Sequence, residues 1–127
     1  MIKRTLLPLT LLVAIAAATP PEVVDAEFHF ALNKSMPEAE SAIESPPEIR
    51  LWFTEVPKAE TTSIRLIAAD EEAIETGDVT QDTEDEPSFA VVLERALSPG
   101  TYTVSWRAMG SDGHVLRSAY EFTVVAQ

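Results

Sequence analysis

The sequence predicts an all-β fold, an immunoglobulin-like Greek-key β-sandwich or barrel of about seven short strands. Apolar and polar residues alternate with a period of two in several short segments, and turn residues separate these segments. No stretch shows the period of a long amphipathic helix, and a tyrosine follows a glycine-containing corner late in the chain. A chain of 127 residues is long enough for one such domain.

Residues 1–26 are predicted to be a secretory signal peptide that precedes a folded domain at residues 27–127. Lys3 and Arg4 give a positive start, and the apolar run Thr5–Ile15 is followed by small residues. That run is shorter than the about 20 residues that a membrane-spanning helix needs. We therefore expect a periplasmic protein with no membrane span after the signal is removed.

Two positions satisfy the small-residue rule for signal cleavage. Cleavage after Ala18 would leave Thr19 as the first residue, whereas a site after Ala26 follows the helix-breaking pair Pro20 and Pro21. The sequence leaves both positions open.

Composition excludes several classes of function. The chain has no cysteine, so it can form neither a disulfide framework nor a thiolate metal site. Its net charge of −12 argues against nucleic acid and anionic membrane surfaces as partners. Most of this charge is interpreted as a contribution to solubility.

The first strands are expected at His29–Leu32 and Glu48–Thr54. In the second segment Ile49, Leu51 and Phe53 share one face, which is typical of a half-buried strand. A less regular strand is expected at Ile64–Ile67.

Residues 70–88 are expected to form a solvated loop with one short edge strand, because like charges repel in a packed element. The nine acids of this segment are Asp70, Glu71, Glu72, Glu75, Asp78, Asp82, Glu84, Asp85 and Glu86.

The C-terminal part of the chain shows the clearest strand pattern. A strand around Phe89–Leu93 has apolar residues on both faces, so we expect it to be covered on both sides. Tyr102 follows the corner at Gly100, which is the pattern of a tyrosine corner in immunoglobulin-like sandwiches. Trp106 shares the face of Tyr102 and is expected in the core. The last strand, Ser118–Val124, is expected to pair with the strand before it.

The only two histidines of the chain, His29 and His114, flank strands that a Greek-key sandwich could bring to one end. Asp112 is two residues before His114, so in an extended loop the two side chains point the same way. Imidazole nitrogen and carboxylate oxygen suit Cu(II), and zinc could use the same atoms with a fourth ligand or water. The other interpretation is a plain hairpin turn at the Asp-Gly pair, with incidental histidines.

Several segments occur in the same order in one known family. They are His29-Phe30-Ala31-Leu32, Ser35-Met36-Pro37, Leu51-Trp52-Phe53-Thr54-Glu55, Gly100-Thr101-Tyr102, Trp106-Arg107, Ser111-Asp112-Gly113-His114 and Phe122-Thr123-Val124. Together they resemble the CopC family of periplasmic copper-binding proteins over nearly all of residues 29–125.

The resemblance implies a Cu(II) site made by His29, Asp112 and His114. Glu55 falls on the glutamate of the family's Phe-Ser-Glu segment, an occasional ligand or near neighbour, although a solvated acid at a strand end explains it equally well. The implied function is copper buffering, trafficking or resistance, in which copper passes by ligand exchange to a partner such as an inner-membrane copper transporter. No catalytic turnover is implied.

This sequence departs from the family at its start. The family's first histidine is usually the mature N-terminus, which here would require cleavage after Phe28, a poor residue for that position. Cleavage after Ala26 gives a chain that begins at Glu27, whose amine, two amides and the His29 imidazole can chelate Cu(II). With cleavage after Ala18, His29 offers only its ring nitrogen.

The methionine content also departs from that of some family members, which carry a methionine-rich segment. Only Met36 and Met109 follow the signal peptide, so we expect no thioether site for Cu(I).

Two other functions are compatible with the residues. The first is a copper oxidase of the histidine-brace type, which also uses an N-terminal histidine. The second is an immunoglobulin-like interaction module that binds no metal.

Overall fold

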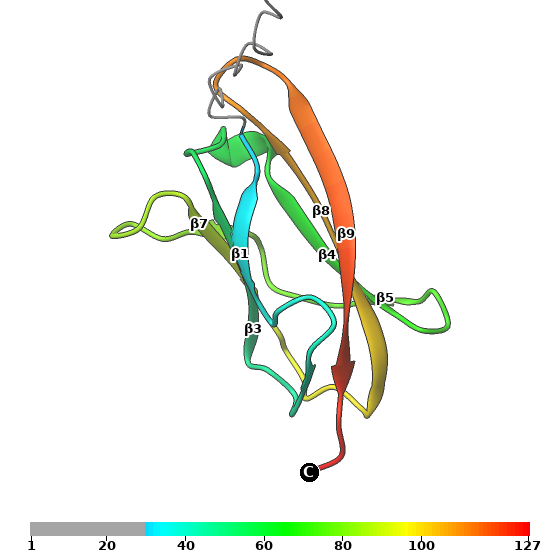
Figure 1. The fold of residues 1–127 in the computed structure, drawn as a ribbon. Helices are drawn as coiled ribbons and strands as arrows, with labels where there is room; N and C mark the ends of the chain where they lie inside the picture. The colour runs from blue at the N-terminus through cyan, green and yellow to red at the C-terminus, as the bar shows by residue number, and fades with distance from the viewer. Residues whose placement is uncertain (1–29) are drawn as a thin grey trace, which may run out of the picture.

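The computed structural model describes residues 30–127 as two β-sheets that pack face to face (Figure 1). One sheet has the order β1 (Leu32–Met36), β3 (Glu48–Phe53), β7 (Ser88–Val92) and β6 (Thr80–Gln81). The other has the order β2 (Ala42–Ile43), β9 (Val115–Val124), β8 (Gly100–Met109), β4 (Ser63–Ala68) and β5 (Ala73–Ile74). A short 3-10 helix, η1 (Ala59–Thr61), connects β3 to β4. The predicted all-β sandwich is confirmed.

Strand pairing is antiparallel within both sheets except between β2 and β9, which are parallel. The longest pairing joins β8 to β9, from Gly100 opposite Val124 to Met109 opposite Val115. The predicted hairpin across Ser111–His114 is therefore present. In Figure 1 its tip lies at the same end of the molecule as η1 and the start of β1, and the C-terminus lies at the opposite end.

The hydrophobic core follows the period-two pattern of the sequence. Ile49, Leu51 and Phe53 of β3 are each at most 3% exposed, as their shared face predicts. Strand β7 is buried from Ser88 to Val91, which confirms that it is covered on both faces. Trp106 is also a core residue, as expected.

The corner before β8 is closed by a side chain. The Tyr102 hydroxyl donates a hydrogen bond of 2.6 Å to the carbonyl oxygen of Ser98. Its ring stacks on Phe122 of β9, with centroids 5.8 Å apart. This contact pattern confirms the predicted tyrosine corner.

The acidic segment differs from its prediction, because it holds two short edge strands instead of one. β5 extends the five-stranded sheet and β6 the four-stranded sheet. Two side chains of β3 also tie the segment to the outer face of its sheet. Arg50 Nη1 lies 3.3 Å from Asp82 Oδ2, and Trp52 Nε1 donates to Asp85 Oδ2 at 3.1 Å. Trp52, which alternates with the buried Leu51 and Phe53, therefore lies on the outer face.

The first strand begins later than expected. It was predicted at His29–Leu32, but β1 spans Leu32–Met36, and His29 lies outside the described residues. The reason is its pairing with β3, which places Leu32 opposite Phe53 and Met36 opposite Arg50. No helix within residues 30–127 is long and apolar enough to cross a membrane.

The tyrosine corner generates a prediction about stability. Tyr102→Phe removes the hydroxyl that bonds to Ser98 and should lower the free energy of unfolding by about 1 kcal/mol, measured by urea denaturation.

Tyr120→Phe is the matched control for Tyr102→Phe. The Tyr120 hydroxyl is buried and makes no hydrogen bond of normal geometry within residues 30–127. Burial raises its pKa to about 12, although nearby Ser35 acts in the opposite direction. Removing this hydroxyl should leave stability unchanged or raise it. Equal losses in both variants would contradict the assignment of the corner bond.

Candidate metal centre

The β8–β9 loop, residues 110–114, is held in shape by its own backbone. The Gly113 amide donates to the Gly110 carbonyl, and the Gly110 amide donates to the His114 carbonyl, both at 3.0 Å. Gly113 has a φ of +86°, in the left-handed region where glycine is favoured. The hairpin-turn interpretation of the Asp-Gly pair is therefore correct for the backbone, and a site for the side chains is compatible with it.

Asp112 and His114 form a closely bonded pair at this loop. Asp112 Oδ1 accepts the backbone N–H of His114 at 3.0 Å, and its Oδ2 lies 2.7 Å from His114 Nδ1. Because an ionised carboxylate only accepts, Nδ1 carries the proton in the metal-free pair. The carboxylate thus fixes both the ring orientation and the place of the proton.

The pair shifts the pKa of each partner. The hydrogen bond with His114 lowers the pKa of the Asp112 carboxyl, and the hydrogen bond with Asp112 raises the pKa of the His114 imidazole. The stabilisation from His114 is complete below its ordinary pKa of 6.5 and is lost as the pH rises through the raised value. The stabilisation from Asp112 is lost as the pH falls through its lowered pKa. Both side chains are mostly exposed, so this contribution to stability is small.

The same two side chains line a pocket of about 310 Å³ together with Phe30 and Leu116. Phe30 stacks on Phe53 of the core, with ring centroids 5.3 Å apart. The sequence reasoning missed Phe30 and Leu116 as parts of the site. Their only signals were that Phe30 follows His29 and that Leu116 is two residues after His114.

Gly110 also shapes the site. A Cβ at this position would lie 3.1 Å from Asp112 Oδ1 and 3.4 Å from the Cβ and Cγ of Phe30. The absence of a side chain here lets Phe30 and the Asp112 carboxylate approach the same turn.

The other two predicted ligands are Glu55 and His29. Glu55 follows β3 and is half-buried. Within residues 30–127 no three His, Cys, Asp or Glu side chains form a group that could hold a metal ion. Glu55 therefore does not complete a set of three with Asp112 and His114. His29 lies outside the described residues.

The Asp112–His114 pair holds a nitrogen donor and an oxygen donor close together. The observed Nδ1 to Oδ2 distance is 2.7 Å. This is the length of a charge-assisted hydrogen bond, so in the neutral imidazole Nε2 is the ring nitrogen that keeps a lone pair.

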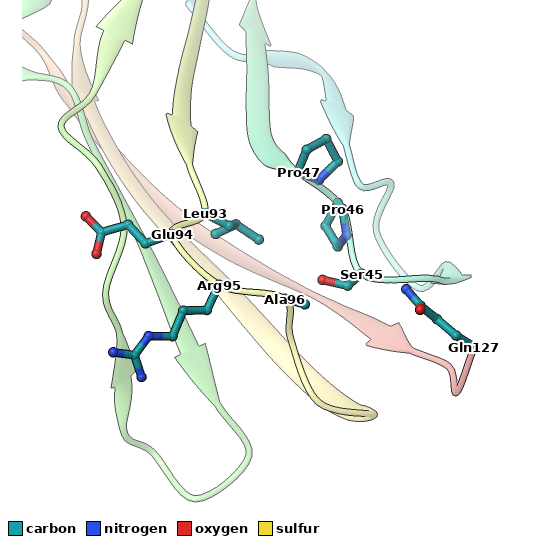
Figure 2. A pocket seen from close by; sticks show the side chains of 8 residues that line it. All are labelled: Ser45, Pro46, Pro47, Leu93, Glu94, Arg95, Ala96 and Gln127. Atoms are coloured by element: carbon teal, nitrogen blue, oxygen red, sulfur yellow. The ribbon is translucent and has the colours of Figure 1, made fainter.

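A second pocket, of about 290 Å³, lies at the other end of the sandwich (Figure 2). It is lined by Ser45, Pro46, Pro47, Leu93, Glu94, Arg95, Ala96 and Gln127. Figure 2 shows the side chains of Glu94 and Arg95 directed away from the two prolines. With no imidazole among its lining residues, this pocket has weaker metal chemistry than the Asp112–His114 pair.

The fold and this pair define a class: a small β-sandwich protein with an Asp-x-His pair on its longest hairpin. Residues 32–125 match the CopC domain, and the chain therefore belongs to the CopC family. CopC proteins are periplasmic copper-binding proteins without enzymatic activity. The histidine-brace oxidase interpretation is set aside on this ground.

Curated relatives support the same family. The chain is 30% identical over 97 residues to Protein YobA of Escherichia coli K12, covering 76% of this chain and 78% of that protein. It is 29% identical over 102 residues to Copper resistance protein C of Escherichia coli, covering 76% and 81%.

Solved structures agree with the fold. PcoC, a methionine-rich copper resistance protein from Escherichia coli, superposes with a TM-score of 0.69 at 30% identity, covering 76% of this chain and 99% of that chain. CopC from Methylosinus trichosporium OB3b also gives 0.69, at 26% identity, covering 76% and 93%.

The pair generates a prediction for the copper-free protein. In an NMR titration the ring of His114 should show a pKa above 6.5, and Asp112→Asn should lower it because the charged acceptor is lost. Ser111→Ala, an exposed change in the same loop, is the control and should leave the titration unchanged. An unchanged His114 pKa in Asp112→Asn would show that the hydrogen bond does not persist in solution.

Proposed function

We propose that the protein binds one Cu(II) ion through His29, Asp112 and His114 and passes it to a partner in the periplasm. The observation that carries this proposal is the Asp112–His114 pair, with its 2.7 Å contact, in a chain of the CopC family. Nitrogen and oxygen donors of this kind suit Cu(II). Glu55 is not included among the proposed ligands, because within residues 30–127 it forms no group of three with Asp112 and His114.

Covalent geometry supports His29 as the third ligand. His29 is bonded to Phe30, and consecutive Cα atoms are about 3.8 Å apart. Phe30 lines the pocket that Asp112 and His114 also line. His29 is therefore one residue along the chain from a residue that lines the same pocket as the pair.

Exposure supports transfer by ligand exchange. The side chains of His114 and Asp112 are 86% and 63% exposed. Incoming ligands of a partner can approach an ion held there without opening the fold. An inner-membrane copper transporter is the partner that we propose.

The pair also sets how binding depends on pH. Cu(II) would compete with a proton for the ring of His114, because an imidazolium has no nitrogen lone pair to offer a metal ion. Because the pKa of His114 is raised, this competition extends above pH 6.5, and copper affinity should fall as the pH is lowered through the raised value.

Replacing His114 tests the proposal. The wild-type protein should bind one Cu(II) in isothermal titration, with nitrogen hyperfine structure in EPR, and His114→Ala should weaken binding by more than about tenfold. Arg117→Ala, an exposed change on the same strand, should bind like wild type. A His114→Ala protein with wild-type affinity, or a wild type that binds no Cu(II), would refute the assignment.

The mature terminus gives a separate prediction. Mass spectrometry of the exported protein should find a chain that begins at Thr19 or Glu27. A start at Glu27 adds the terminal amine as a copper ligand and should raise the number of coordinated nitrogens seen by EPR. A mature protein that retains residues 1–18 would contradict export through signal cleavage.

A further inference from the structure

Thr54 holds the chain just before β1 by two hydrogen bonds. The Ala31 amide donates to the Thr54 Oγ1 at 2.9 Å, and the Thr54 amide donates to the Ala31 carbonyl at 2.8 Å. Thr54 directly follows the last residue of β3, and Ala31 directly precedes the first residue of β1. The backbone bond therefore continues the pairing of these strands by one residue, and the bond to the Thr54 hydroxyl adds a second link at the same place.

Phe30, the next residue toward the N-terminus, lies between the core and the β8–β9 loop. Its ring stacks on Phe53 at an interplanar angle of 26°. Its Cβ and Cγ also lie against Gly110, where no side chain intervenes. Phe30 is thus in contact with the turn that carries Asp112.

These contacts order Phe30 and Ala31 before any ion binds. The entropy of fixing two backbone residues is then lost on folding, so that it no longer opposes copper binding. A ligand attached to an ordered residue also has a higher effective concentration at the site than one on a free chain.

We propose that Thr54 is a positioning residue for the copper site: it holds the chain that carries His29 beside Asp112 and His114. This inference rests on the proposed function. Among the described residues, Thr54 acts on the site through its two hydrogen bonds to Ala31, the residue after Phe30.

The test compares Thr54→Val, which keeps the shape of the side chain but loses the hydroxyl, with Thr54→Ser, which keeps the hydroxyl. Copper binding to the mature protein is measured for both variants, with His29→Ala and the double variant completing a cycle. Thr54→Val should weaken Cu(II) binding by about tenfold, the size of effect expected from a partner beyond the ligands, and Thr54→Ser should restore it.

The cycle separates positioning from general stability. Thr54→Val should lose the same EPR nitrogen coupling as His29→Ala and should have little further effect in the His29→Ala background. Thermal melting follows the fold of each variant. Thr54→Ala, which removes the hydroxyl without adding an apolar methyl in its place, is the second variant if Thr54→Val does not fold.

Two results would overturn the inference, and they differ from each other. If His29→Ala weakens binding but Thr54→Val binds like wild type, or weakens binding equally with and without His29, the copper site stands and the positioning role fails. A self-contained chelate at Glu27–His29 would give that result. If His29→Ala binds copper like wild type, both the role of Thr54 and the assignment of His29 fail.

Discussion

The packing of Phe53 is the constraint on which the end of the molecule that carries the Asp112–His114 pair depends. Its ring contacts Phe30 before β1, Phe89 on β7 and Trp106 on β8, with centroids 5.3, 6.1 and 5.3 Å away. One side chain at the end of β3 therefore joins both sheets to the chain that enters the fold. Because protein interiors are close-packed, a shift of Phe53 would be transmitted to Phe30. The position of Phe30 in the pocket that Asp112 and His114 also line is thus set by the core of the sandwich.

Much of the fold could be predicted from the sequence, because its longer strands are specified by local patterns. The alternation at Ile49–Phe53 and the corner at Tyr102 each depend on residues close together in the chain. The strands β2, β5 and β6 have two residues each, too few to show a period. They exist because β9, β4 and β7 offer free edges to pair with, which is information that only the folded chain contains.

The candidate site divides in the same way. Asp112 and His114 are two residues apart, so the loop alone could suggest that they meet, and they do. Gly110 and Phe30 are far apart in sequence, and their contact follows from the packing of β1 beside the β8–β9 loop. No local pattern encodes such a contact. The parts of His29 and Glu55 in copper binding remain predictions.

The Asp112–His114 pair meets two demands that normally conflict in a metal carrier. Tight binding favours donors that are held in place before the ion arrives, whereas rapid exchange favours donors that a partner can reach. Here the loop's backbone hydrogen bonds and the carboxylate hold the imidazole, although its side chain is 86% exposed. In the protonated pair a positive charge already lies beside the carboxylate. A Cu(II) ion bound at this pair would bring two positive charges in place of the proton's one, and the Asp112 carboxylate would balance one of them.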